Sequence, residues 1–215
     1  MNVITRSLIR VSYCVLCIIT QSCSHPSISA EEQDVMEATI AQCRFLSPTA
    51  QYVIHHQTSI DMLRLEYPSY DEFSEKLKKE ALYKPRDVWE AVNDFLVKNR
   101  NDTELVFPRH LSRNEQFFAA TTERRLQPKA HSDDRDKSRT EYWDSFWRYY
   151  PSAKGMIVLS RPGFDSKHGT AVIHISKMTG HGGGGSILIL KRLSGRWQLQ
   201  DYDRDLEHFW TSESA

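Results

Sequence analysis

The chain has 215 residues, with 28 basic and 28 acidic side chains interleaved along it, and 40% of its residues are hydrophobic. This neutral balance argues against nucleic acid as a partner, because binding to phosphates depends on clustered Lys and Arg. No apolar run reaches the roughly 18 to 20 residues that a membrane-spanning helix requires. The length is typical of one globular domain, which we place at residues 31–210.

Residues 1–30 have the layout of a secretory signal. Arg6 and Arg10 precede the apolar run VSYCVLCII, and a polar stretch follows it, which is the order of regions that signal peptides share. Two cleavage points compete: before Cys23, where the preceding TQS resembles a lipobox with Thr in place of the usual Leu, and before Glu31. We therefore expect export to the periplasm or cell envelope, with lipid attached to Cys23 if the first point is used. A buried N-terminal helix is the alternative.

The cleavage point also decides the cysteine chemistry. Cys14 and Cys17 leave with the signal, so the mature chain keeps at most Cys23 and Cys43. A free Cys23 in an oxidising compartment would be able to form a disulfide with Cys43. Lipidation of Cys23, or cleavage before Glu31, leaves Cys43 as a small buried hydrophobe.

The region after the signal predicts a helix and then a strand. The pattern Ser29-x-x-Glu32 resembles a capping box, and the helix that it opens continues to about Cys43 with a loose apolar pattern. Residues 51–58 (QYVIHHQT) begin with β-branched and aromatic side chains, which favour a strand.

Two clearer amphipathic helices follow. Ser69-x-x-Glu72 opens a helix at 70–83 whose apolar residues share one face and whose lysines face water. A second helix at 87–98 has apolar residues at i, i+4, i+7 and i+8, with Trp89 beside them. We expect both helices to pack on a sheet.

A charged segment separates these helices from an aromatic one. Residues 126–138 (LQPKAHSDDRDKS) have no periodic apolar positions, which predicts a solvated, mobile loop. Ser138-x-x-Glu141 then predicts the start of the helix EYWDSFWRYY, which Pro151 ends. Its aromatic stripe could stack against a ligand, but a helix that leads directly into a sheet usually buries such a stripe, so we expect it in the core.

The sheet is predicted at residues 155–203. Four apolar runs, GMIVLSR, TAVIHISKM, SILILKRL and RWQLQDY, alternate with turn sequences, and all nine glycines lie between Gly155 and Gly195. This pattern predicts an α+β fold in which an antiparallel C-terminal meander of about four strands packs against the N-terminal helices. The central runs are apolar enough that both sheet faces should be covered. We expect Trp197 to pack under the aromatic helix near Phe146.

Several of these segments resemble a family of exported bacterial proteins without an assigned activity. The shared features are YVIHHQT, FLVKNRN at a helix end, the aromatic helix ending in YYP, an S-R-x-G-F strand end and a G-x-W terminal hairpin. The match covers residues 51–202 and departs from the family where His181 precedes four glycines. The resemblance implies a common fold and an envelope setting, and the family has no assigned activity to carry over to this chain.

The sequence contains parts of a phosphate loop and several histidines, but neither matches the pattern of a functional site. The glycines at 180–185 are followed by a strand rather than the helix that a phosphate loop needs, so they predict a flexible hairpin. His55 and His56 point to opposite faces of one strand, and His168 and His181 flank another at its two ends. We therefore predict no metal site and no cofactor.

Three side chains are candidate ligand-binding residues: Arg161, His174 and Asp203. Arg161 stands at a strand end, where it could clamp an anionic group, although an ion pair with Asp165 or Asp201 that fastens a turn is the alternative interpretation. Asp203 belongs to an acidic run that lacks the glycine and glutamate of a calcium loop.

The polar turns of the meander, at 161–168 and 179–185, are expected at opposite ends of the sheet and so cannot form one catalytic site. We therefore expect a noncatalytic binding or structural module. Its partner would be an envelope protein or a wall component, with membrane contact only through a lipid anchor on Cys23. The alternatives are a small-ligand-binding domain and a hydrolase with its site between helices and sheet, which a pocket joining Arg161, His174 and Asp203 would favour.

Overall fold

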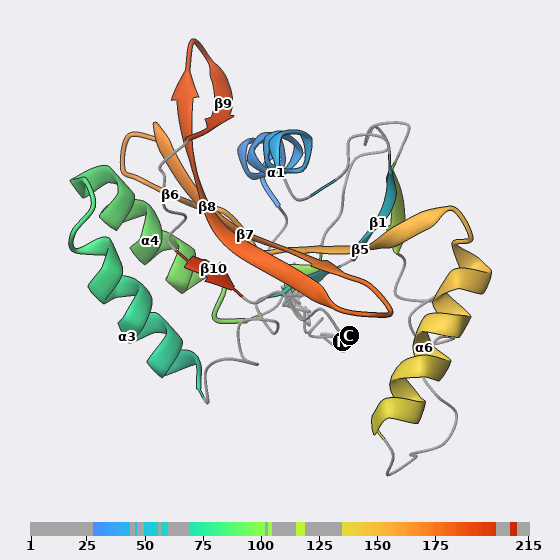
Figure 1. Cartoon of the computed structure of the whole chain (residues 1–215). Coiled ribbons are helices and arrows are strands. Elements are labelled where there is room, and N and C mark those ends of the chain that lie inside the picture. The colour runs from blue at the N-terminus through green and yellow to red at the C-terminus, as the bar shows by residue number, and fades with distance from the viewer. Residues whose placement is uncertain are drawn as a thin grey trace, which may run out of the picture.

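The fold combines helices with a curled, mixed sheet, which confirms the predicted α+β class (Figure 1). The computed structural model describes residues 28–43, 46, 50–55, 57–59, 69–101, 103–104, 115–118, 135–200 and 207–209. The predicted signal up to residue 27, including Cys23, lies outside the described residues, as do residues 126–134 of the predicted loop.

The main sheet has the strand order β10-β8-β7-β5-β1-β4, with β6 paired to β7 and β9 paired to β8. Its strands are β1 (Gln51–His55), β4 (Glu115–Phe118), β5 (Ala153–Leu159), β6 (Gly163–Phe164), β7 (Thr170–Met178), β8 (Gly183–Leu193), β9 (Arg196–Leu199) and β10 (Glu207–Phe209). From β5 to β9, paired strands run antiparallel, as predicted for the meander. However, β1 pairs in parallel with both β4 and β5, so the whole sheet is mixed. The long connection between β1 and β5 permits this, because parallel neighbours need a crossover of a dozen or more residues.

The strand predicted at 51–58 is interrupted after His55. The strand β2 (Gln57–Thr58) forms a separate antiparallel pair with β3 (Thr103–Glu104). The Thr58 hydroxyl secures this pair, because it accepts from the Thr103 amide at 2.9 Å and donates to the Thr103 carbonyl at 3.2 Å. The break moves the chain out of the main sheet directly after β1.

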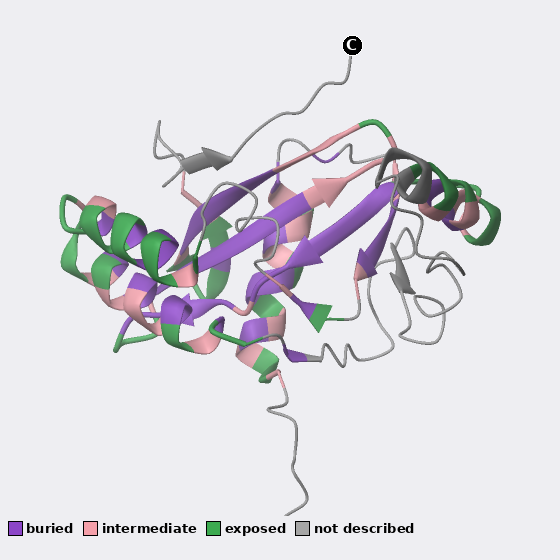
Figure 2. Ribbon diagram, turned by 90° about the horizontal axis from the view of Figure 1, so that it is seen from below, coloured by how far each residue is buried: buried purple, intermediate pink, exposed green. Residues whose placement is uncertain are grey.

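Helices cover both faces of the sheet. They are α1 (Ala30–Gln42), α3 (Tyr70–Ala81), α4 (Arg86–Lys98) and α6 (Arg135–Tyr149). α1 lies on one face, while the α3–α4 pair and α6 lie at opposite ends of the molecule on the other side (Figure 1). β7 is buried from Thr170 to Ser176, as both of its faces were predicted to be (Figure 2). None of the helices in the described part of the chain is long and apolar enough to cross a membrane.

Each helical layer has its own hydrophobic cluster. Val35 and Met36 of α1 pack with odd-numbered residues of β7, and α4 packs with Val172 on the opposite face of the same strand. The centre of the aromatic stripe of α6 is core, as predicted: Trp143 and Phe146 are 6% and 0% exposed and pack against β1 and β5, whereas Tyr149 at the helix end is 48% exposed. Alternation along the strands thus divides their side chains between α1 and the other helices.

The predicted helix starts at Ser29 and Ser69 are confirmed. The Ser29 hydroxyl accepts from the Glu32 amide at 3.1 Å, and the Glu32 carboxylate accepts from the Ser29 amide at 2.8 Å, which completes a capping box. The Ser69 hydroxyl accepts from the Glu72 amide at 3.2 Å. These local side-chain bonds satisfy backbone donors that a helix start leaves open.

The start of the aromatic helix was predicted too late. α6 begins at Arg135, so residues 135–138 form its first turn rather than the end of a loop, and Ser138 lies inside the helix. Arg and Lys are good helix formers. They extend the helix beyond the aromatic stripe without adding an apolar position.

Trp197 lies on a surface other than the one predicted, and Trp89 is more exposed than the apolar stripe beside it. Trp89 is 40% exposed, because it follows Val88 by one residue and so points about 100° away from the buried stripe of α4. Trp197 belongs to the cluster beneath α1 and not to that of Phe146. It pairs with Arg192 of β8, whose even-numbered residues face α1, so the pairing register decides its side.

α1 is also bonded to the last strand of the meander. The Gln42 side-chain amide donates to the Trp197 carbonyl at 3.0 Å, and its oxygen accepts from the Leu199 amide at 2.9 Å. Gln42 therefore occupies the edge of β9 as a further strand would.

Candidate functional site

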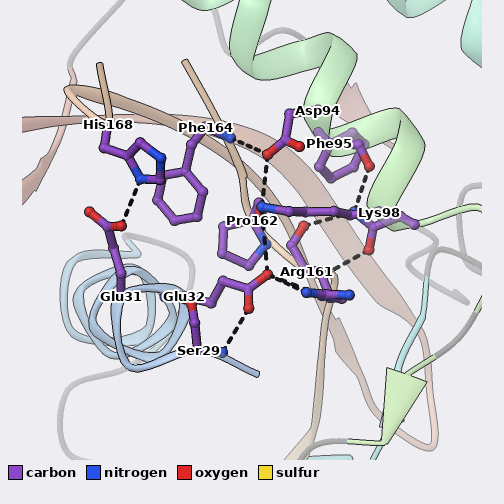
Figure 3. Close-up of polar contacts among 11 residues, drawn as sticks. Ser29, Glu31, Glu32, Asp94, Phe95, Lys98, Arg161, Pro162, Phe164 and His168 are labelled. Carbon is purple, nitrogen blue, oxygen red and sulfur yellow. Dashed lines mark hydrogen bonds and ion pairs between the residues drawn. The ribbon is translucent and has the colours of Figure 1, made fainter. Parts of the chain in front are cut away.

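The segment SRPGF, residues 160–164, leads from β5 into β6 and carries the candidate Arg161. The Arg161 guanidinium donates from Nε and from an NH2 group to one oxygen of Glu32, at 3.0 and 2.8 Å (Figure 3). The Glu32 side chain is 3% exposed and that of Arg161 is 14% exposed. The second oxygen of Glu32 accepts from the Ser29 amide, so both oxygens have donors. Lys98 approaches the first oxygen to 3.7 Å.

Asn99 fixes the backbone of Arg161. Its side-chain oxygen accepts from the Arg161 amide at 2.7 Å, and its amide group donates to the carbonyls of Arg161 and Phe95, each at 2.8 Å. Asn99 is the C-cap of α4 and is 4% exposed. The guanidinium is thus tied to α1 and the backbone to α4, which lie on opposite faces of the sheet.

Gly163 and Phe164 bring the strand against α4. A Cβ atom at Gly163 would lie 2.1 Å from the Phe95 amide nitrogen and 2.3 Å from the Ala91 carbonyl oxygen, so no larger residue fits without moving the helix. The Phe164 amide donates to Asp94 at 2.8 Å, and Asp94 also pairs with Lys98 at 2.8 Å (Figure 3). Close packing against α4 therefore accounts for glycine at position 163, and the ion pair with Glu32 accounts for arginine at position 161.

The interpretation of Arg161 as an internal ion pair is confirmed, but with Glu32 rather than Asp165 as its partner. The Asp165 carboxylate instead accepts from the amides of Gly169 and Thr170, at 2.7 and 2.6 Å, inside its own turn. Asp201, the other suggested partner, lies outside the described residues. An anionic ligand at Arg161 would have to compete with Glu32.

His174 is buried in the middle of β7, on the face opposite α1, with 1% of its surface exposed. Burial lowers its pKa to about 3, because the charged imidazolium is poorly solvated there, while the nearby backbone of Ser59 slightly opposes the shift. Neither ring nitrogen makes a hydrogen bond of normal geometry with the described residues, and the same holds for the Ser176 hydroxyl. His174 is therefore a neutral side chain at physiological pH.

Gly185 makes room for this imidazole. A Cβ atom at Gly185 would lie 2.9 Å from His174 Nε2 and 3.0 Å from both the Ile175 carbonyl oxygen and the Ser176 Cβ. The last glycine of the GHGGGG run is thus a strand residue with a packing role, since β8 begins at Gly183. The run forms a hairpin, as predicted, with its turn between Thr179 and Gly182.

The two described candidates are backbone neighbours but do not converge. The Ser160 amide donates to the His174 carbonyl at 3.0 Å, and the Ser160 hydroxyl accepts from the His174 amide at 2.8 Å. Arg161 then points to α1, whereas His174 points to the opposite face. The third candidate, Asp203, lies outside the described residues.

The remaining described histidines give no metal cluster. Within the described ranges, no three His, Cys, Asp or Glu side chains are grouped closely enough to hold a metal ion. His168 instead pairs through Nδ1 with Glu31 at 2.7 Å, and Arg192 pairs with the same carboxylate at 3.0 Å. Both carboxylates of the first turn of α1, Glu31 and Glu32, are therefore bound to the end of the sheet.

The sequence analysis missed three exposed apolar side chains at the turn between α3 and α4 and at the start of α4. Leu82 and Tyr83 are 67% and 85% exposed, and Trp89 follows them at the start of α4. We call these three residues the α3–α4 tip. A signal was present in the sequence, because Leu82 and Tyr83 follow Lys78 and Lys79 by four residues and so share the solvent face of the helix.

Comparison of the chain with family models, with characterised proteins and with solved structures found no match. The resemblance to exported bacterial proteins stays a prediction.

Proposed function

We propose that this protein is a noncatalytic binding or structural module of the cell envelope. The observation that carries the proposal is the buried pair between Arg161 and Glu32. Arg161 is the side chain best suited to hold an anionic substrate, and its charge is already paired with Glu32 inside the fold. This pair helps to join helices on both faces of the sheet.

The state of His174 also supports a noncatalytic role. A general acid or base works best when its pKa lies near the working pH, and burial holds the pKa of His174 at about 3. Ser176, two residues along the same face of β7, is also buried, and its hydroxyl makes no hydrogen bond to the described residues. The pair thus lacks the hydrogen bond that activates a serine nucleophile.

The capping box favours one of the two cleavage points of the export signal. Cleavage before Glu31 would remove Ser29, whose hydroxyl caps α1, and such a cap contributes about 1 kcal/mol. Cleavage before Cys23 keeps the cap and makes Cys23 the first residue. We therefore propose that the mature protein is held in the envelope through lipid on Cys23, with its α+β domain facing the aqueous side.

The mature mass tests this part of the proposal. We expect protein from the native envelope to begin at Cys23 and to carry a lipid mass that Cys23→Ala abolishes. A lipid-free chain that begins at Glu31 or Met1 would contradict it.

A panel of ester, peptide and glycan substrates tests the noncatalytic role. We expect no turnover above that of a heat-denatured sample, because neither described candidate has an available charge or a suitable pKa. Turnover that is lost in His174→Gln, while the unfolding midpoint in urea is unchanged, would replace the proposal with the hydrolase alternative. Turnover that is equal in wild type and His174→Gln would place the site among other residues and would equally overturn the noncatalytic role.

A further inference from the structure

The α3–α4 tip lies at one extremity of the molecule, at the opposite end from α6 (Figure 1). Large apolar side chains at such a position cost solubility and are usually found where a surface meets a partner. Tyr and Trp are the aromatic residues most suited to a boundary between water and an apolar phase, because each has an apolar body and a polar group. The tip is therefore a candidate interaction surface.

Helix geometry places positive charge around the tip. Leu82 continues the α3 helix, with αR backbone angles and an amide that donates to the Lys78 carbonyl at 3.1 Å. Lys78 and Lys79 are exposed one turn before Leu82 and Tyr83, with Lys79 opposite the buried side chains of α3 and Lys78 at the flank of that buried face. Glu80, the acidic residue between these pairs, is half-buried.

Acidic residues at the start of α4 are neutralised locally. Glu90 pairs with Arg86 at 2.9 Å, and hydrogen bonds from Ser166 together with Arg86 lower the pKa of this carboxyl. Asp87 pairs with Lys191 of β8. The exposed lysines of α3 therefore face solvent beside an apolar tip at which Asp87 and Glu90 already have cationic partners, while the exposed Glu75 lies one turn further from the tip.

We propose that the α3–α4 tip docks on the surface of a bilayer that contains anionic lipids. A convex turn with Leu, Tyr and Trp can enter the headgroup region, while lysines one turn behind it contact the lipid phosphates. A protein partner would instead need a much larger complementary area, of about 1,000 Å² or more in total. The inference rests on the proposed binding role and names its partner, and it adds a second membrane contact to the lipid on Cys23.

Vesicle sedimentation of the Cys23→Ala mature chain tests the tip without the lipid anchor. We expect binding to vesicles of equal parts phosphatidylglycerol and phosphatidylcholine, weak binding to phosphatidylcholine alone, and a loss of binding as salt is added. The double variant Leu82→Ser/Tyr83→Ser should bind the mixed vesicles about tenfold more weakly or worse. Lys78→Gln/Lys79→Gln should lose a similar factor on the mixed vesicles, with no change on phosphatidylcholine.

Tyr149→Ser is the matched control, because Tyr149 is an exposed tyrosine, 48% accessible, on α6 at the other end of the molecule. It should bind as the wild type does, and all variants should keep the wild-type unfolding midpoint. Mixed vesicles that do not bind the wild type at low salt, or that bind Leu82→Ser/Tyr83→Ser equally well, would overturn the proposal. Neither result would contradict the proposed noncatalytic role. The substrate panel tests that role separately, and only turnover would contradict it.

Discussion

Arg161, in the segment between β5 and β6, is joined to His174 of β7 through Ser160, yet the two side chains are accommodated in opposite ways. Arg161 donates to a buried carboxylate, whereas His174 is neutral and makes no hydrogen bond of normal geometry with the described residues. A guanidinium cannot release its proton, so burial demands a partner. An imidazole can release one, so it tolerates burial as a neutral group, at the expense of stability in acid.

Removal of Arg161 should show the largest effect. Arg161→Ala leaves the Glu32 carboxylate buried, with Lys98 as its nearest cation at 3.7 Å, so we expect the free energy of unfolding to fall by about 3–5 kcal/mol. Urea unfolding measures this loss. A loss below about 1 kcal/mol would show that water or Lys98 replaces Arg161 as the partner of the Glu32 carboxylate. The ion pair would then contribute little to the free energy of unfolding.

A double variant separates the pair from the packing around it. Glu32→Met/Arg161→Met removes both charges and should cost clearly less than the sum of the two single changes, because neither partner is left buried alone. Additive losses would mean that the two side chains contribute independently and that their contact is incidental.

Lowering the pH should reduce the free energy of unfolding through His174. This loss should be smaller than that caused by Arg161→Ala. The unfolded chain binds a proton near pH 6.5 and the folded chain only near pH 3, so stability falls as the pH drops below about 6.5. At pH 5 the His174 contribution amounts to about 2 kcal/mol relative to pH 8. Urea melts at both pH values should show this loss in wild type, and His174→Leu should lose about 2 kcal/mol less. Equal pH dependence in the two proteins would place a protonated imidazole in the native state.

Local structure was predicted correctly from the sequence where a few neighbouring residues determine it. Ser29 and Ser69 begin helices because their hydroxyls bond amides three residues later, and β7 is buried on both faces because most residues at its centre are apolar. The parallel pairing that makes the sheet mixed could not be predicted, because nothing within β1 specifies that its neighbours run parallel to it. The same limit applies to Trp197, whose side of the sheet is fixed by its register with β8.

The candidate site was predicted in part for the same reason. The sequence identified Arg161 as a residue held in a turn, but Glu32 is 129 residues away and no pattern links the two positions. The burial of His174 followed from its strand, whereas its fit against Gly185 depends on the pairing of β7 with β8. The α3–α4 tip was missed because the apolar stripe of α3 ends at Ala81, and Leu82 and Tyr83 after it were not assigned to a face of the helix.

The bonds between Gln42 and the last strand of the meander set the order in which the protein is able to fold. Gln42 and its partners Trp197 and Leu199 are separated by 155 and 157 residues, so the core beneath α1 cannot close until the ribosome has released residue 199. Contacts of such long range form slowly, because the chain between them must first lose much of its freedom. A nascent chain therefore keeps the apolar residues beneath α1 uncovered by β9 until that strand has left the ribosome.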